Sequence, residues 1–352
     1  MRRRDFLALA GASLCLPFAV RAQGEYPLVT PRPLVFPRDH GAHPAFRTEW
    51  WYITGWLGEE RGFQLTFFRN RPGVAEDNPS AFAPKQLLFA HAAVSDARQG
   101  RLLHDQRVVR AGFGLAEARE DDTDVRIGDW WLRRTESGYR TRIAAQDFAF
   151  ELSFRSTQPL LLQGEAGFSS KGPRPEEASY YYSRPHLAAA GRLRLGDEDR
   201  AVEGRAWLDH EWSSEYLSRD AAGWDWTGLN FDDGAALMAF CIRGKDGGTY
   251  WAGATYRDAR GVRTVYRPEE VRFEALRTWR SPRTDVVYPV AMRLHIGPHA
   301  FMLEPLMDDQ ELDSRASTGA IYWEGAMRVL RGERVVGRGY MELTGYYERL
   351  RM

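Results

Sequence analysis

The strongest constraint on the fold is a pattern of strand-like segments that occurs twice along the chain. The sequence WYITGW at 51–56 is echoed by WDWTGL at 224–229. Each copy is followed by a polar turn, a glycine and an apolar run that ends in arginine, at 62–69 and at 234–243. A motif that returns in the same order in both halves indicates a tandem duplication of one folding unit.

The ends of the two copies correspond as well. GRAWLD at 204–209 resembles GRGYME at 337–342. The copies predict two domains, at 40–215 and 216–352. Because the connection around residue 216 contains no proline and little glycine, we expect it to be ordered. The two domains should then pack together, with Trp212 and a tryptophan of the second domain at the junction.

Apolar residues recur with a period of two within each copy. Phenylalanine and leucine alternate with smaller or polar residues at 148–154, which is typical of a half-buried strand. The chain has 12 Trp, 15 Tyr, 18 Phe and 33 Gly, a composition that suits strands, turns and ring-filled barrels. We therefore predict an all-β protein made of two tandem lipocalin-like (calycin) antiparallel β-barrels packed together, with a β-sandwich as the alternative.

Residues 1–22 have the features of a signal peptide. A basic start precedes an apolar run at 8–20, and a small-residue cleavage motif ends at Ala22. The RRDFL sequence at 3–7 favours the twin-arginine export route, and an ordinary Sec signal is the alternative. We expect a periplasmic or secreted protein that keeps Cys241 as its single cysteine and so forms no intrachain disulfide.

Charge and motifs exclude several classes of function. The 48 basic and 48 acidic residues balance, which argues against a nucleic-acid binder. The zincin, nucleophile-elbow, phosphate-loop and dinucleotide motifs are missing from the sequence. His40 and His43 lack further ligands at a metal-binding spacing, so we expect no metal and no other cofactor. A serine hydrolase would need an unmarked nucleophile, such as Ser213 or Ser214 beside His210.

Four stretches of the sequence resemble the AttH-type family of secreted proteins. They are FPRDHGAHP at 36–44, RTEWWYITG at 47–55, DHEW at 209–212 and GYMELTGY at 339–346. The resemblance covers essentially the whole chain after residue 22. It implies two lipocalin-like domains and a relationship to the carotenoid 1,2-hydratases (hydroxyneurosporene synthases). Members of the family are often called predicted secreted hydrolases or are associated with the permease of an ABC exporter.

The resemblance also implies site residues. In the hydratases a His-x-Trp pattern belongs to the proposed active site, which makes His210 and Trp212 catalytic candidates. An acidic residue from a later strand contributes there, but the corresponding run at 237–242 has none. This departure weighs against true hydratase activity. Asp225 between two tryptophans is a substitute, and a turn-capping role is its alternative.

The residues of 209–212 also form the densest titratable cluster in the sequence. In a strand, Asp209 and Glu211 share one face, and His210 and Trp212 share the other. A histidine beside an aromatic wall is suited to move a proton next to an apolar substrate, and Asp209 or Glu211 would set the neighbouring electrostatics. The alternative is an inter-domain brace of a satisfied histidine, paired carboxylates and a packing tryptophan.

Glu49 gives one carboxylate inside an aromatic run. Apolar neighbours would raise its pKa and make it an acid, whereas in the alternative it pairs with an arginine across the barrel and the rings fill the core. The candidate ligand-binding residues, each with core packing as its alternative, are Trp51, Tyr52, His91, Tyr181, Trp212, Trp224 and Trp226.

These patterns predict a protein that binds a hydrophobic small molecule, a lipid or a polyene, near the junction of the two barrels. In one alternative it is a hydratase of acyclic carotenoid-like substrates or a hydrolase, with His210, Asp209, Glu49 or Asp225 moving the proton. In another it is a non-catalytic lipid-handling partner of an ABC exporter permease.

Overall fold

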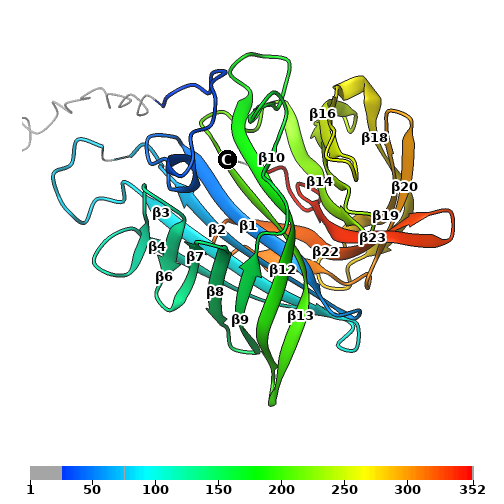
Figure 1. The fold of residues 1–352 in the computed structure, drawn as a ribbon. Helices are drawn as coiled ribbons and strands as arrows, with labels where there is room; N and C mark the ends of the chain where they lie inside the picture. The colour runs from blue at the N-terminus through cyan, green and yellow to red at the C-terminus, as the bar shows by residue number, and fades with distance from the viewer. Residues whose placement is uncertain (1–25, 75, 351–352) are drawn as a thin grey trace, which may run out of the picture.

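Two antiparallel β-sheets dominate the computed structural model, which describes residues 26–74 and 76–350 (Figure 1). The strands of the first sheet are β1 (Thr48–Leu57), β2 (Arg61–Asn70), β3 (Leu87–Asp96), β4 (Leu102–Arg110), β5 (Ala116–Ala118), β6 (Asp124–Ile127), β7 (Trp130–Thr135), β8 (Gly138–Ala144), β9 (Phe148–Arg155), β10 (Leu161–Leu162), β11 (Phe168–Ser170), β12 (Ala178–Leu195) and β13 (Glu198–Ser213). Those of the second sheet are β14 (Ala221–Phe231), β15 (Ala236–Gly244), β16 (Thr249–Arg257), β17 (Arg263–Tyr266), β18 (Val271–Arg280), β19 (Val287–Ile296), β20 (His299–Pro305), β21 (Glu311–Ser314), β22 (Ala320–Arg331) and β23 (Arg334–Leu343). Two short 3-10 turns complete the structure, η1 (Arg38–His40) and η2 (Pro268–Glu270). The predicted signal peptide at 1–22 lies outside the described residues.

Each sheet pairs its opening strand with its closing strand. In the first sheet β1 lies between β2 and β13, and in the second β14 lies between β15 and β23. The alternation at 148–154 points one side of β9 into the core of the first sheet, as the period of two predicts. Each sheet curls around an apolar core of its own. The predicted all-β fold of two lipocalin-like barrels is confirmed.

The two barrels pack together through the outer faces of their opening and closing strands. A third apolar cluster lies between the two cores and is built mostly from large aromatic rings. Tyr52 and Trp207 come to it from the first barrel, and Trp226 and Tyr340 from the second. Since every one of these side chains is buried, the barrels form one continuous body rather than two loosely linked domains.

The connection between the barrels, 214–220, is held by side chains. The Ser214 hydroxyl donates to the carbonyl of Pro27 at 2.7 Å. The ring of Tyr216 packs edge-on against both Trp50 and Trp224. Trp212, which the sequence placed at the junction, belongs instead to the core of the first barrel. Tyr216 lies at the junction, where we expected Trp212.

The opening motif of the repeat is offset by one residue from the structural correspondence. The sequence pairs Trp51 with Trp224, but Trp51 points into the first barrel while Trp224 lies at the junction. Trp50, on the junction face, is the structural counterpart of Trp224. Because side chains alternate along a strand, a slip of one residue exchanges the two faces. The closing motif has no such slip, since Asp209 and Glu342 both face the junction.

No helix among residues 26–74 and 76–350 is long and apolar enough to cross a membrane.

Candidate active site at the barrel junction

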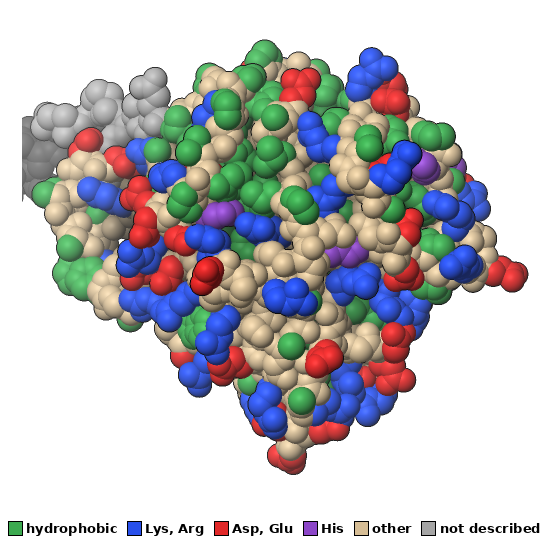
Figure 2. Space-filling view, viewed as in Figure 1, with side chains coloured by type: hydrophobic (Ala, Val, Ile, Leu, Met, Phe, Trp, Pro, Cys, Tyr) green, Lys and Arg blue, Asp and Glu red, His purple; other side chains and the backbone are tan. Residues whose placement is uncertain are grey.

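A cavity of about 60 Å³ lies between the two barrels. Its walls are rings from both barrels, and four carboxyl groups also line it. The lining residues are Trp50, Tyr52, Thr66, Phe68, Tyr181, Asp209, Glu211, Tyr216, Trp224, Trp226, Tyr322, Glu324 and Glu342. Apolar side chains gather on the surface over β10 and beside β14, in the upper middle of Figure 2.

Asp209 is held by three donors from the first barrel. The Tyr181 hydroxyl donates to Oδ2 at 2.7 Å, and Ser183 and the Trp207 indole donate to Oδ1 at 2.5 and 2.7 Å. Burial raises the pKa of Asp209, and although these hydrogen bonds oppose the shift, the pKa reaches about 7. Asp209 is therefore poised to take up or release a proton near neutral pH.

Glu342 is the counterpart of Asp209 in the second barrel. It accepts a hydrogen bond from the Trp224 indole at 3.0 Å. Burial raises the pKa of Glu342 to about 7, with a further contribution from the charge of Glu211. A tryptophan donor and a titratable carboxyl thus occur on both sides of the cavity.

Glu324 on β22 is the third carboxyl. The Tyr52 hydroxyl of the first barrel donates to its Oε1, and the Tyr322 hydroxyl also interacts with the carboxyl group. Burial and the nearby Glu342 raise the pKa of Glu324 well above its ordinary value. This environment favours the neutral form of the carboxyl, which carries a proton that it can donate.

Glu211, the fourth carboxyl, is paired with a buried lysine. The Lys171 ammonium lies 2.8 Å from Oε1 of Glu211, which also accepts a hydrogen bond from the Ser179 hydroxyl. Lys171 is 1% exposed and lies over the rings of Tyr181, Tyr216 and Phe240. Burial lowers the pKa of this lysine, and of the pair it is Glu211 that lines the cavity.

His210 and Glu49 lie inside the first barrel, on the far side of the sheet from this cavity. Nε2 of His210 is 2.9 Å from Glu49 Oε1, and Nδ1 of His43 is 2.7 Å from the same oxygen. Arg69 donates to the other oxygen of Glu49 at 2.8 Å. The His210 ring stacks on Trp51. Strand alternation explains the separation from Asp209, because the two residues are neighbours on β13.

The expectation of a raised pKa for Glu49 is wrong. Burial on its own would raise it, but the charges of His43 and Arg69, together with the hydrogen bonds from His210 and His43, hold its pKa well below the usual range. The alternative, an arginine paired with Glu49, is what the structure contains, although Arg69 comes from the neighbouring strand β2 rather than from across the barrel. Trp212 stacks on His43 with ring centroids 3.8 Å apart, so it is also part of this interior group.

The interior group brings together a set of metal-ligating atoms that the sequence spacing did not reveal. One ligand atom each from His43, Glu49 and His210 lie within 4.8 Å of one another. Every imidazole nitrogen of the two histidines already has a hydrogen-bond partner, and Arg69 places a positive charge on the same carboxylate. These contacts fit an ion-paired core better than a metal centre.

Two further candidates lie elsewhere. Asp225 lies inside the second barrel, where Arg243 and Tyr346 bind it at 3.1 and 3.0 Å. It does not line the cavity, because it alternates with the two flanking tryptophans that do. His91 lies on β3 of the first barrel, and its side chain contacts Tyr322 of the second barrel.

The cavity thus contains Asp209, Tyr52, Tyr181, Trp224 and Trp226 of the predicted residues. Trp50, Tyr216 and two of the carboxyl residues were not predicted. The repeat carried a signal for Glu342, because it aligns with Asp209 in the closing motif. Glu324 had no such signal.

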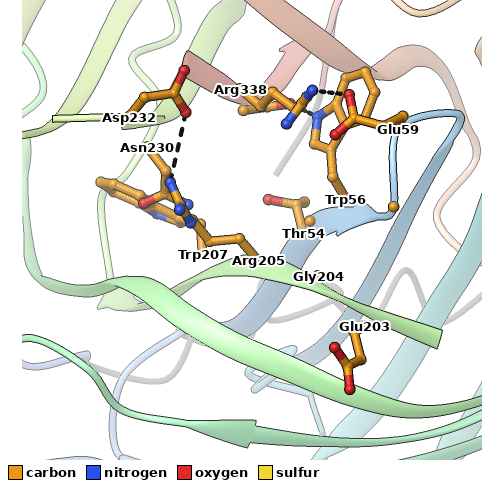
Figure 3. Close-up of a pocket in the computed structure, with 13 residues that line it drawn as sticks. Thr54, Trp56, Glu59, Glu203, Gly204, Arg205, Trp207, Asn230, Asp232 and Arg338 are labelled. Atoms are coloured by element: carbon orange, nitrogen blue, oxygen red, sulfur yellow. Dashed lines mark hydrogen bonds and ion pairs between the residues drawn. The ribbon is translucent and has the colours of Figure 1, made fainter. Parts of the chain in front are cut away.

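A second hollow of about 240 Å³ opens at the other end of the same junction (Figure 3). Trp56 and Trp207 line it, with charged side chains around them. Arg338 reaches Glu59 beside Trp56, and Arg205 lies 3.9 Å from Asp232 on the opposite side. Trp207 connects the two hollows, because its indole donates to Asp209.

The sequence and the fold both have known relatives. A family model described as AttH-like matches residues 27–346, which confirms the predicted resemblance. The crystal structure of an AttH from Nitrosomonas europaea is 55% identical, with 92% of this chain and 100% of that chain covered and a TM-score of 0.86. None of the curated proteins matches the sequence.

More distant structures share the fold. Kievitone hydratase from Nectria haematococca is 16% identical, with 93% of this chain and 97% of that chain covered and a TM-score of 0.66. The crystal structure of CghA is 16% identical, with 92% and 97% covered and a TM-score of 0.53.

Proposed function

We propose that this chain, which belongs to the AttH-like family, binds the unsaturated end of a hydrophobic molecule in the junction cavity. It then adds water to that end. Glu324 is the acid and Asp209 the base. The observation that carries this proposal is a neutral carboxyl, Glu324, inside a cavity walled by aromatic rings.

The chemistry requires two carboxyl groups with different roles. The Glu324 O–H bond breaks and its proton forms a C–H bond with one carbon of a C=C group, leaving a cation on the other carbon. Water attacks that carbon and loses a proton to Asp209, whose pKa near 7 lets it accept one. The sum is one alkene and one water giving one alcohol, with a proton gained at Asp209 and lost at Glu324.

The walls suit the cationic intermediate. Trp50, Trp224 and Trp226 line the same cavity, and an indole face attracts positive charge. Since the cavity measures only about 60 Å³, it holds one end of a long substrate rather than the whole molecule. The fold is also that of a protein named for hydration, kievitone hydratase, which adds weight to this reaction over hydrolysis.

A second candidate function is lipid handling without chemistry. Half-buried apolar side chains, including Leu217, Tyr250 and Trp251, pack against the junction cluster. These apolar side chains would hold an acyl chain for an ABC exporter permease. For either function we propose a periplasmic or secreted location, on the basis of the predicted signal peptide.

The test uses the purified mature protein. Native mass spectrometry and titration with a fluorescent polyene fatty acid measure binding, and incubation with an acyclic carotenoid measures the gain of one water. We expect Glu324→Gln and Asp209→Asn to bind the polyene but to lose turnover.

Two matched controls keep full turnover: Glu333→Gln at an exposed turn, and Asp225→Asn, a buried acid of the second barrel. Polyene binding without turnover in the wild-type protein would favour lipid handling. No binding and no turnover would contradict both functions.

A further inference from the structure

A chain of hydrogen bonds leads from the surface toward Glu324. At its outer end the half-buried Ser317 hydroxyl, between β21 and β22, donates to Gln106 Oε1 at 2.6 Å. Nε2 of His91 lies 2.8 Å from that Ser317 hydroxyl. Nδ1 of His91 lies 2.8 Å from the hydroxyl of Tyr322. The two ring nitrogens of one histidine therefore join an accessible hydroxyl to a buried one.

The inner end of the chain is the junction cavity. The Tyr322 hydroxyl interacts with the Glu324 carboxyl, to which Tyr52 also donates. His91 and Glu324 are each 1% exposed, so the chain crosses a dry interface. Each member has one partner on either side, an arrangement that allows protons to pass in sequence.

The chain alternates between the two barrels. His91 and Tyr52 come from the first barrel, on β3 and β1, whereas Ser317, Tyr322 and Glu324 come from the second. A brace between barrels needs only one such contact. Hydrogen bonds join four groups in sequence, Gln106, Ser317, His91 and Tyr322, and Tyr322 in turn interacts with a proton-donating carboxyl, which is more than a brace requires.

We propose that Ser317, His91 and Tyr322 form a proton relay that reprotonates Glu324 from solvent while the cavity is occupied by substrate. This inference rests on the proposed function, because it supplies the proton that Glu324 loses in each turnover. The relay solves a problem of access, since a hydrophobic ligand in the cavity blocks solvent from the carboxylate.

The steps of the relay balance. The Glu324 carboxylate takes the proton of the Tyr322 hydroxyl, which takes the proton on Nδ1 of His91. The Ser317 hydroxyl turns from Gln106 Oε1 toward the ring, and Nε2 of His91 takes its proton. Ser317 then takes a proton from water, which leaves hydroxide in the solvent. The result is a neutral carboxylic acid and a histidine with its proton moved from Nδ1 to Nε2. The relay returns to its starting state when the hydroxyls of Ser317 and Tyr322 rotate and the proton of His91 returns from Nε2 to Nδ1.

His91 has the properties that a relay needs. Burial and the neighbouring His104 lower its pKa to about 3, so it stays neutral at physiological pH. A neutral imidazole has one donor and one acceptor nitrogen at the same time. A charged imidazolium would have two donors and would block passage.

The experiment follows the Glu324 proton directly, without a substrate. The infrared C=O band of the protonated carboxyl, identified by its loss in Glu324→Gln, shifts when deuterium replaces the proton after transfer to D₂O. We expect exchange to slow by about a hundredfold in His91→Phe, the lower end of what positioned proton-transfer groups contribute. Exchange should slow by a smaller factor in Ser317→Ala, because water can replace a hydroxyl at the half-buried end.

Rescue and controls separate a relay from a structural brace. Free imidazole should restore fast exchange in His91→Ala, with a rate that depends on imidazole concentration. His295→Gln, a histidine outside the relay, should exchange like the wild type. The Asp209 band, identified with Asp209→Asn at pH 5.5, should be unchanged by substitution of His91.

Wild-type exchange rates in His91→Phe and Ser317→Ala, or slow exchange in His91→Ala that imidazole does not restore, would overturn the relay. If His91→Phe does not fold, Ser317→Ala and the imidazole rescue of His91→Ala decide the result. Failure of the proposed function is distinct: it would appear as a protein whose Glu324 exchanges through His91 but which hydrates no alkene.

Discussion

Tyr52 of the first barrel donates a hydrogen bond to Glu324 of the second, so a hydrogen bond between two buried side chains joins the two domains. The pair links an aromatic hydroxyl whose pKa is raised by burial to a carboxyl whose pKa is raised by burial. Burial therefore favours the neutral form of both groups. The packing of the two barrels and the protonation of Glu324 in the cavity therefore depend on the same hydrogen bond.

The strength of this bond is measurable by a double-mutant cycle. Tyr52→Phe and Glu324→Gln should each lower the free energy of unfolding, and the coupling between them should be about 1 kcal/mol, as for a hydrogen bond between neutral groups. Chemical denaturation of the wild type, the two single variants and the double variant gives the value. Additive effects would mean that the contact contributes no stability.

The contribution of Asp209 to the stability of the protein should fall as the pH rises toward 7. Asp209 has a pKa of about 7 in the folded protein against 3.8 as its ordinary value, so the folded state binds more protons between these limits. The stability that this group contributes is fully present below about pH 4 and is lost as the pH rises through 7.

Asp209→Asn removes this titration. The free energy of unfolding of the variant should gain on that of the wild type by up to about 1.4 kcal/mol per pH unit within the window. Urea denaturation between pH 4 and 8 measures both curves. Parallel curves would contradict the raised pKa. Glu333→Gln, at an exposed turn, is the control and should run parallel to the wild type.

Glu49→Gln should destabilise the first barrel without affecting the cavity. The substitution leaves the Arg69 charge buried without its carboxylate, a loss that typically costs about 3–5 kcal/mol. Polyene binding at the junction should persist under conditions where the variant stays folded. Loss of binding in a folded Glu49→Gln protein would show that the interior group acts on the cavity after all.

The first barrel should not be stable alone. A chain that ends near Tyr216 exposes Tyr52, Trp56 and Trp207, which the second barrel covers in the whole protein. Exposed rings of this size favour aggregation. Binding of a hydrophobic dye, a broad unfolding transition and poor solubility of residues 26–216 would agree with this expectation. A soluble half with a sharp transition would contradict it.

The fold could be read from the sequence because two signals agreed. The period of two at 148–154 fixed strands, and the repeated motifs fixed their grouping into two sets. Only part of the site could be predicted from the sequence. A strand sequence tells which residues share a face, as for Asp209 and Glu211, but it does not tell which face looks inward. The sequence therefore grouped His210 with Asp209 at the junction, whereas His210 binds Glu49 inside the first barrel.

Other parts of the site depend on contacts between distant strands. Glu324 and Tyr52 are 272 residues apart in sequence, and no spacing rule links them. The ion pair of Glu49 with Arg69 likewise depends on cross-strand register, which the hydrophobic pattern alone did not specify. The low pKa of Glu49 follows from that pairing, so it was out of reach as well.

The reciprocal packing of the strands has an evolutionary consequence. The opening strand of each barrel contacts the closing strand of the other, β1 with β23 and β14 with β13. Contacts of this reciprocal kind define an isologous interface, in which two identical subunits meet around a twofold axis. A single ancestral barrel that self-associated through this face would have brought two copies of the same acid together, at the positions that Asp209 and Glu342 now occupy. Fusion of two such copies into one chain would then have freed each copy to change by itself, which would account for the asymmetry of the present cavity.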